Sequence, residues 1–150
     1  MNDEQPTDRL PVKSLGVLSL GEISPNFALH RQELIDLSGR IKGEDRERVV
    51  RYLRGGTIIF AAMEYTIDVI SNAFGRPGGS GIRTDGDYYW RGDCADYVQH
   101  YGVGLPNDFL RHMERLEWTT PVVSPERALE IDRYLMGLKK PRSGLPSELA

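Results

Sequence analysis

The sequence predicts an α+β fold in which a small antiparallel sheet packs against several helices. The sheet is expected to contain a hairpin at residues 80–91 and a strand at residues 57–70. The hairpin is predicted by Asp85-Gly86, a dipeptide typical of two-residue turns between strands. The strand is predicted by the alternation of apolar and polar residues from Met63 to Val69. The helices are predicted by apolar residues that recur three and four positions apart.

The N-terminal third predicts one short strand followed by two helices. A broken alternation at residues 12–23 indicates the strand. Ser24-Pro25 is typical of a helix start, with a capping hydroxyl followed by a proline in the first turn. The apolar residues expected on one face of that helix are Phe27, Leu34, Leu37 and Ile41. Residues 44–54 form a clearer helix, with acidic residues in its first turn and Gly55-Gly56 as a left-handed stop.

The segment at residues 57–70 changes to the period of a strand. Its apolar side consists of Met63, Tyr65, Ile67 and Val69, and its polar side of Glu64, Thr66 and Asp68. This pattern predicts a half-buried strand, although a helix is left open because alanine and methionine permit one. The following residues 72–79 are rich in glycine and predict a mobile loop. Its glycines lack the spacing of a phosphate-binding loop.

The hairpin is the main candidate for recognition. A two-residue turn would pair Arg83 with Tyr88, and Ile82 with Tyr89. Alternation then separates one face with Arg83, Tyr88 and Trp90 from another with Ile82, Thr84, Asp87 and Tyr89. One face must pack on the core, and the other is interpreted as a binding surface, because Tyr, Trp and Arg dominate interface hot spots. The predicted partner-binding residues are Arg83, Asp85, Asp87, Tyr88, Trp90 and Arg91.

Three helices are predicted after the hairpin, all packed on one face of the sheet. Asp93 caps a helix at residues 94–101, which Gly102 ends. Leu105-Pro106 begins the next helix, at residues 106–117, and Ser124-Pro125 begins the last, at residues 125–137.

Composition indicates one soluble domain at residues 1–138 with a flexible tail at residues 139–150. The chain is 39% hydrophobic and 27% charged, and its net charge is −3. An acidic balance argues against nucleic-acid and membrane-surface binding and fits a basic partner protein. The single cysteine, Cys94, excludes an internal disulfide. Neither a signal-peptide core nor an apolar run of membrane-spanning length is present, so a cytoplasmic location is expected.

Catalytic and metal-binding motifs are weak. His30, His100 and His112 lack the spacing of a zinc site, so no metal and no cofactor are expected. Cys94 lies on an apolar helical stripe beside aspartates, which is typical of a structural thiol. A small hydrolase that uses Glu64, Asp68 or Asp87 is the enzymatic alternative. No catalytic residue is assigned, and a non-enzymatic binding protein is favoured.

A block over about residues 48–113 resembles a widespread family of small bacterial cytosolic proteins. Its elements here are Thr84-Asp85-Gly86, Trp90, Tyr97-Val98, and Leu105-Pro106-x-x-Phe109-Leu110. The resemblance implies an immunity protein of a polymorphic toxin system, which would neutralise its cognate toxin by occlusion. It implies no catalytic residue. A regulatory dimer without a toxin link is left open, and so is a homodimer of the binding protein.

Overall fold

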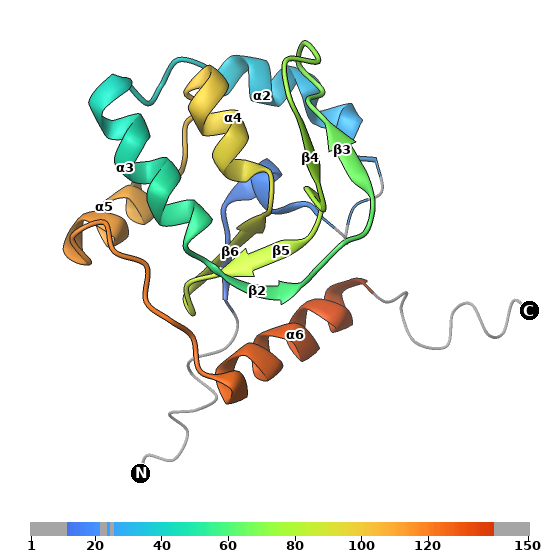
Figure 1. Cartoon of the computed structure of the whole chain (residues 1–150), viewed down its shortest axis with the longest axis vertical. Helices are drawn as coiled ribbons and strands as arrows, with labels where there is room; N and C mark the ends of the chain where they lie inside the picture. Colours follow the sequence, from blue (N-terminus) through green and yellow to red (C-terminus); the bar gives the residue numbers. More distant parts are fainter. Residues whose placement is uncertain (1–11, 22–23, 25, 140–150) are drawn as a thin grey trace, which may run out of the picture.

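The computed structural model describes residues 12–21, 24 and 26–139 of the chain. Within them it has an α+β fold with five helices, a four-stranded mixed sheet and a two-stranded hairpin (Figure 1). The predicted fold class is therefore confirmed. The predicted tail lies outside the described residues except for Lys139, with which the last helix ends.

The main sheet has the strand order β1-β6-β5-β2. Its strands are β1 (Lys13–Ser14), β6 (Tyr88–Arg91), β5 (Ile82–Thr84) and β2 (Thr57–Phe60). The strand β1 runs parallel to β6, and the other neighbouring strands are antiparallel, so the sheet is mixed and not purely antiparallel. The strand predicted near the N-terminus is only two residues long, because the chain turns into a 3-10 helix, η1 (Gly16–Ser19).

The strand predicted at residues 57–70 is in fact two strands. The first, β2, joins the main sheet, and the second, β3 (Tyr65–Ile67), pairs with β4 (Gly75–Pro77) in a separate hairpin. The glycine-rich segment thus supplies a strand where a mobile loop was predicted. Glycine is required where the hairpin packs closely, since a Cβ on Gly79 would lie 1.9 Å from Oγ1 of Thr66.

The helices are α2 (Arg31–Leu37), α3 (Gly43–Arg54), α4 (Cys94–Tyr101), α5 (Asn107–Arg115) and α6 (Pro125–Lys139). The last four follow their predicted positions closely, whereas α2 is shorter than predicted and does not contain Phe27 or Ile41. A 3-10 helix, η2 (Phe27–His30), precedes α2, and the proposed start at Pro25 lies outside the described residues. Gly102 ends α4 in the left-handed region with φ 65°, as predicted. Gly55 ends α3 with φ −82°, so the left-handed stop predicted there is wrong.

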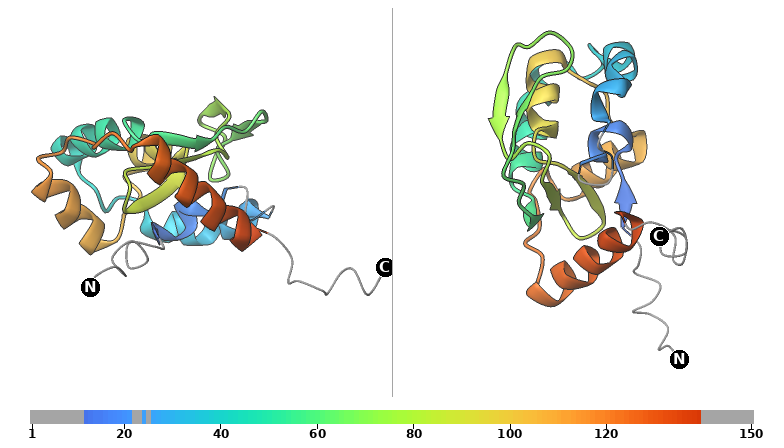
Figure 2. Two further views of the ribbon diagram at one scale, coloured as in Figure 1. Left: turned by 90° about the horizontal axis from the view of Figure 1, so that it is seen from below. Right: turned by 90° about the vertical axis from the view of Figure 1, so that its right-hand side faces the viewer.

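The sheet has a hydrophobic core on each face. Tyr88 and Trp90 belong to the larger core with α3, α4 and α5, whereas Tyr89 packs with Ile131 and Leu135 of α6. The predicted alternation of hairpin faces is confirmed. The expectation that all later helices share one face is wrong, because α6 lies on the opposite side of the sheet (Figures 1 and 2).

The turn between β5 and β6 differs from the predicted two-residue turn. Thr84 pairs with Tyr89, so four residues, 85–88, lie between these two paired residues instead of two. Oδ1 of Asp85 accepts hydrogen bonds from the backbone amides of Asp87 at 2.9 Å and of Tyr88 at 2.8 Å. The Asp85 side chain therefore closes the longer turn, and the shift by two residues leaves each side chain on its predicted face.

Candidate functional site

The predicted recognition residues of the β5–β6 hairpin are mostly buried. The exposed fractions are 0% for Trp90, 6% for Tyr88, 4% for Asp85 and 3% for Arg91. Nε1 of Trp90 donates to the carbonyl of Leu53 at 3.0 Å. Both faces of the hairpin are covered by the molecule's own side chains, so these four residues offer no surface to a partner. Of the six, Asp87 is exposed and Arg83 is half-buried.

Asp85 instead joins the hairpin to two helices. Its Oδ2 accepts a hydrogen bond from the hydroxyl of Tyr52 at 2.6 Å and lies 3.1 Å from Nε2 of His112. Burial, and then the hydrogen bond to Asp85, raise the pKa of Tyr52 well above its usual value. Possible ligand atoms of Asp85, Asp87 and His112 lie within 4.8 Å of one another. Both oxygens of Asp85 already accept hydrogen bonds, so the contacts of this cluster are those of a structural link.

The carboxylates considered for hydrolysis are not brought together. Asp68 is buried at the end of β3, where it accepts hydrogen bonds from the Tyr101 hydroxyl and from the Ala73 amide. Burial alone would raise its pKa, but these hydrogen bonds outweigh burial and lower the pKa of Asp68. Asp87 lies in the β5–β6 turn, at the opposite end of the molecule from the β3–β4 tip (Figure 1). Glu64 is exposed.

Cys94 is fully buried, and burial together with the charge of Asp93 raises the pKa of its thiol. A raised thiol pKa disfavours the thiolate that a nucleophile requires.

The β3–β4 hairpin turns its polar side inward. Oγ1 of Thr66 lies 3.1 Å from Oδ2 of Asp93, at the start of α4. Arg76 donates to Asp96 in the first turn of α4, from Nε at 2.6 Å and from Nη2 at 2.8 Å. Of the residues predicted on the polar side, Thr66 and Asp68 therefore pack on the molecule, whereas Glu64 is exposed.

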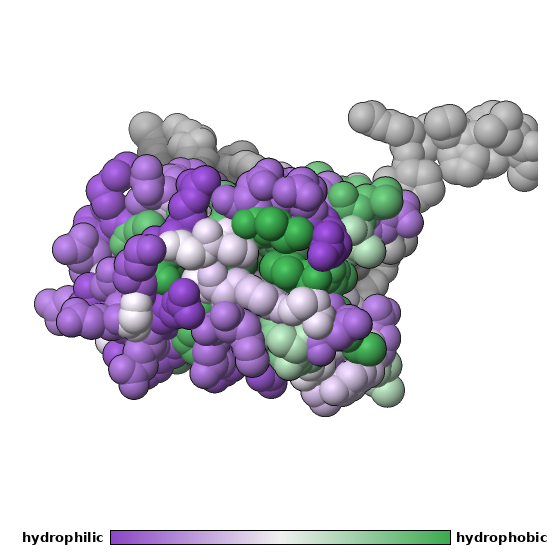
Figure 3. Space-filling model, turned by 90° about the horizontal axis from the view of Figure 1, so that it is seen from above, coloured by the Kyte–Doolittle hydropathy of each residue, from purple (hydrophilic) through white to green (hydrophobic). Residues whose placement is uncertain are grey.

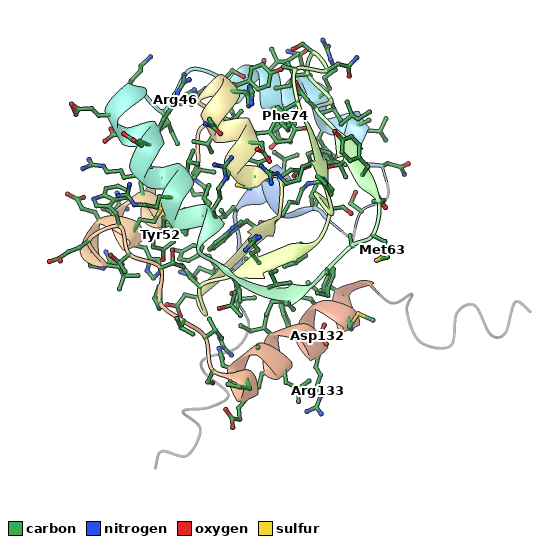
Figure 4. The ribbon with its side chains drawn as sticks, viewed as in Figure 1. Arg46, Tyr52, Met63, Phe74, Asp132 and Arg133 are labelled. Atoms are coloured by element: carbon green, nitrogen blue, oxygen red, sulfur yellow. The ribbon has the colours of Figure 1, made fainter. Side chains whose placement is uncertain are left out.

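Three of the four residues predicted on the apolar side of this segment face solvent, opposite to the expected orientation, whereas Val69 packs on the core as expected. The exposed fractions are 97% for Met63, 62% for Tyr65 and 55% for Ile67, and Ile58 of β2 is also 54% exposed. We call these four residues the docking face. Met63 lies at the outer edge of the molecule, at the bend between β2 and β3 (Figure 4). Seen from the hairpin tip, the surface is mostly polar over α3 and is more apolar towards the hairpin (Figure 3).

A groove lies beside the docking face, between the β2–β5 pair and the base of the β3–β4 hairpin. Its volume is about 340 Å³. Ile58, Phe60 and Met63 contribute apolar walls, and Arg76 and Arg83 also line it. The groove thus combines an apolar lining with two guanidinium groups.

The charge around this groove is positive, although the chain is acidic overall. Arg54 and Arg76 share one carboxylate, that of Asp96. Nη1 of Arg83 donates to the carbonyls of Arg54 at 3.2 Å and of Gly56 at 2.9 Å, and no carboxylate within the described residues pairs with it. Burial, and then the charge of Arg76, lower the pKa of Arg83. The local charge is therefore suited to an acidic partner and not to the basic one that the net charge suggested.

No family model, no curated protein and no solved structure matches this chain. Among the described residues, none of the helices combines the length and apolarity needed to cross a bilayer.

Proposed function

We propose that this is a non-enzymatic binding protein, which engages a partner protein through the docking face. The observation that supports the proposal is the orientation of the β3–β4 hairpin, with polar side chains on the molecule and large apolar side chains in solvent. Fully burying one such apolar side chain contributes about 1.5–3 kcal/mol. Ile58 and Met63 line one groove, and Tyr65 and Ile67 lie on the same side of β3. Exposed apolar side chains of this size favour association with another surface.

The charge beside the docking face favours a partner of a different kind over a second copy of the chain. In a twofold symmetric dimer the same patch faces itself, so the arginines around the groove would be brought close to their own counterparts. Like charges placed together across an interface cost free energy. The fitting partner is a protein that presents apolar side chains next to carboxylates.

Neutralisation of a cognate toxin in the cytoplasm is the narrower form of this function, and it follows from the resemblance of residues 48–113. Occlusion benefits from a binding surface that is ordered before the partner arrives. The contacts of Thr66 with Asp93 and of Arg76 with Asp96 hold the hairpin against α4. They supply such preorganisation.

The test is a comparison of matched surface variants. The wild-type protein is used to isolate a partner from the producing cells, and the purified partner is then titrated by calorimetry. Met63→Asp and Ile67→Asp are expected to weaken binding at least about 10-fold, because each places a charge in an apolar contact. Val122→Asp is the control, since Val122 is 92% exposed but lies between α5 and α6.

Equal affinity of the partner for all three variants would contradict the docking face. Co-expression of the partner with and without this protein then tests whether the partner is a toxin that this protein neutralises. Growth arrest that the wild type relieves and Met63→Asp does not relieve supports neutralisation. Size-exclusion chromatography of the isolated protein tests the remaining alternative, a homodimer.

A further inference from the structure

Two arginines of this protein bind carboxylates in the same way. Arg91 donates to Asp93 from Nε at 2.7 Å and from Nη2 at 2.8 Å. Arg76 donates to Asp96 from the same two nitrogens, at 2.6 and 2.8 Å. In both pairs the Nε–Nη2 edge of the guanidinium makes two hydrogen bonds to one carboxylate, which is the strong and directional form of this interaction.

Arg83 presents the same edge without a partner. Its Nη1 donates to the carbonyls of Arg54 and Gly56, and this accounts for one of the three nitrogens. Its Nε and Nη2 contact no acceptor within residues 12–21, 24 and 26–139. A guanidinium carries five N–H donors, so three of them stay unused.

The position of Arg83 is held by its surroundings. Its Nη1 is fixed to the backbone that follows α3, and its side chain packs closely on Gly56, where an added Cβ would lie 3.0 Å from Cβ of Arg83. A guanidinium held in this way loses little conformational freedom when it binds. The unused edge belongs to a residue that lines the groove of about 340 Å³.

The groove strengthens an interaction with an anion. Ile58, Phe60 and Met63 line it, and apolar surroundings increase the strength of a charge-assisted hydrogen bond. Arg76 lines the same groove and places a second positive charge near it. These features select a negatively charged, planar group over a neutral one.

We propose that Arg83 is the specificity-determining residue of the docking face, and that it binds an Asp or Glu carboxylate of the partner protein in this groove. The carboxylate enters side-on to the Nε–Nη2 edge, as Asp93 and Asp96 do with their own arginines. Apolar residues next to it in the partner segment contact Ile58 and Met63. This inference rests on the proposed function and gives the chemistry that the docking face recognises.

The test follows the Nε–Hε resonance of Arg83 by NMR. The wild-type protein is titrated with the peptide acetyl-Ala-Leu-Glu-Leu-Ala-amide and with its counterpart that has Gln in place of Glu. The Glu peptide is expected to shift the Arg83 Nε–Hε signal and the Ile58 methyl signals with one saturation curve. The Gln peptide is expected to bind at least about 10-fold more weakly, because a bidentate charged contact is lost.

Two variants and one control complete the test. Arg83→Gln removes the charge, and Arg83→Lys keeps the charge but removes the Nε–Nη2 edge that makes two hydrogen bonds. Both variants are expected to bind the Glu peptide about 10-fold or more weakly than the wild type, as measured by the Ile58 methyl signals. Arg51→Gln is the control, because it removes an exposed arginine of α3 that does not line this groove.

Four results would overturn the carboxylate inference. They are equal binding of both peptides, binding of neither peptide, full retention of Glu-peptide affinity in Arg83→Lys, and a loss of Glu-peptide affinity in Arg51→Gln equal to that in Arg83→Gln. A shift of the Arg83 signal on removal of residues 140–150 would also overturn it, since the carboxylate would then come from the protein's own chain. Failure of the proposed function is distinguishable, because the Met63→Asp and Ile67→Asp variants test that function with the partner itself.

Discussion

Replacement of Asp85 by alanine is expected to destabilise the fold more than any other change in the β5–β6 turn. The Asp85 side chain has an exposed fraction of 0%. It accepts hydrogen bonds from the Tyr52 hydroxyl and from the amides of Asp87 and Tyr88. Without it, the Tyr52 hydroxyl and the Tyr88 amide are left buried without this partner. An unsatisfied buried group costs about 1–3 kcal/mol, so the free energy of unfolding falls by about 3–5 kcal/mol.

The contributions separate in a double-mutant cycle measured by urea unfolding. Tyr52→Phe removes only the hydroxyl and is expected to cost about 1 kcal/mol. In the Asp85→Ala background the same change is expected to be neutral or to stabilise by up to about 1 kcal/mol, because it removes a buried hydroxyl that has already lost its partner, and the coupling free energy is about 1–2 kcal/mol. Asp85→Asn keeps an oxygen for the two amides and is expected to cost less than Asp85→Ala.

Asp87→Ala is the control for this experiment, because its side chain is 64% exposed in the same turn. A loss within about 0.5 kcal/mol is expected for that variant. If Asp85→Ala cost no more than Asp87→Ala, the role assigned to Asp85 would be refuted.

Two further predictions concern stability. Gly56→Ala is expected to lower the free energy of unfolding by about 1–3 kcal/mol, because a Cβ would lie 2.7 Å from Cζ2 of Trp90. Gly43→Ala meets nothing within 4 Å and should leave urea unfolding unchanged or slightly improved. Burial, then the hydrogen bond to Asp108, raise the pKa of Tyr88 from 10.0 to about 12. Since the unfolded tyrosine ionises first, the contribution of Tyr88 to stability is full below pH 10.0 and falls as pH rises towards 12, by about 1.4 kcal/mol per pH unit for this one group. A stability that stays constant across this range in urea titrations would contradict the assignment.

The sequence was sufficient for the helices because their signals are local. In α4, apolar residues at Cys94, Tyr97, Val98 and Tyr101 and the stop at Gly102 lie within one segment. The hairpin register was not predictable from Asp85-Gly86 alone. The longer turn is selected by Asp85, whose carboxylate finds partners on α3 and α5, far away in the sequence.

The docking face was missed for a related reason. A period of two identifies the two sides of a strand but not which side is inward. The side of β3 with Thr66 turns inward because Asp93 and Asp96 at the start of α4 provide partners for it and for Arg76. Asp93 makes no side-chain cap for α4, contrary to the prediction, and its carboxylate binds Arg91 and Thr66 instead. The arginines at positions 76 and 91, close in the sequence to Asp93 and Asp96, were a usable signal of polar contacts inside the fold.

The aromatic hairpin was misassigned because hot spots and cores have similar compositions. Tyr88 and Trp90 are residue types enriched in both. Only the packing of α3, α4 and α5 on one face, and of α6 on the other, shows that this hairpin is interior.

Oxidative footprinting of Met63 in the presence and absence of the purified partner tests the docking face most directly. Met63 is 97% exposed in the free protein, and Met136 on α6 is 39% exposed and serves as the internal control. The docking face predicts that a saturating partner protects Met63 from hydroxyl radicals and leaves the oxidation rate of Met136 unchanged. Oxidation of Met63 at the same rate in the free and bound protein would contradict it.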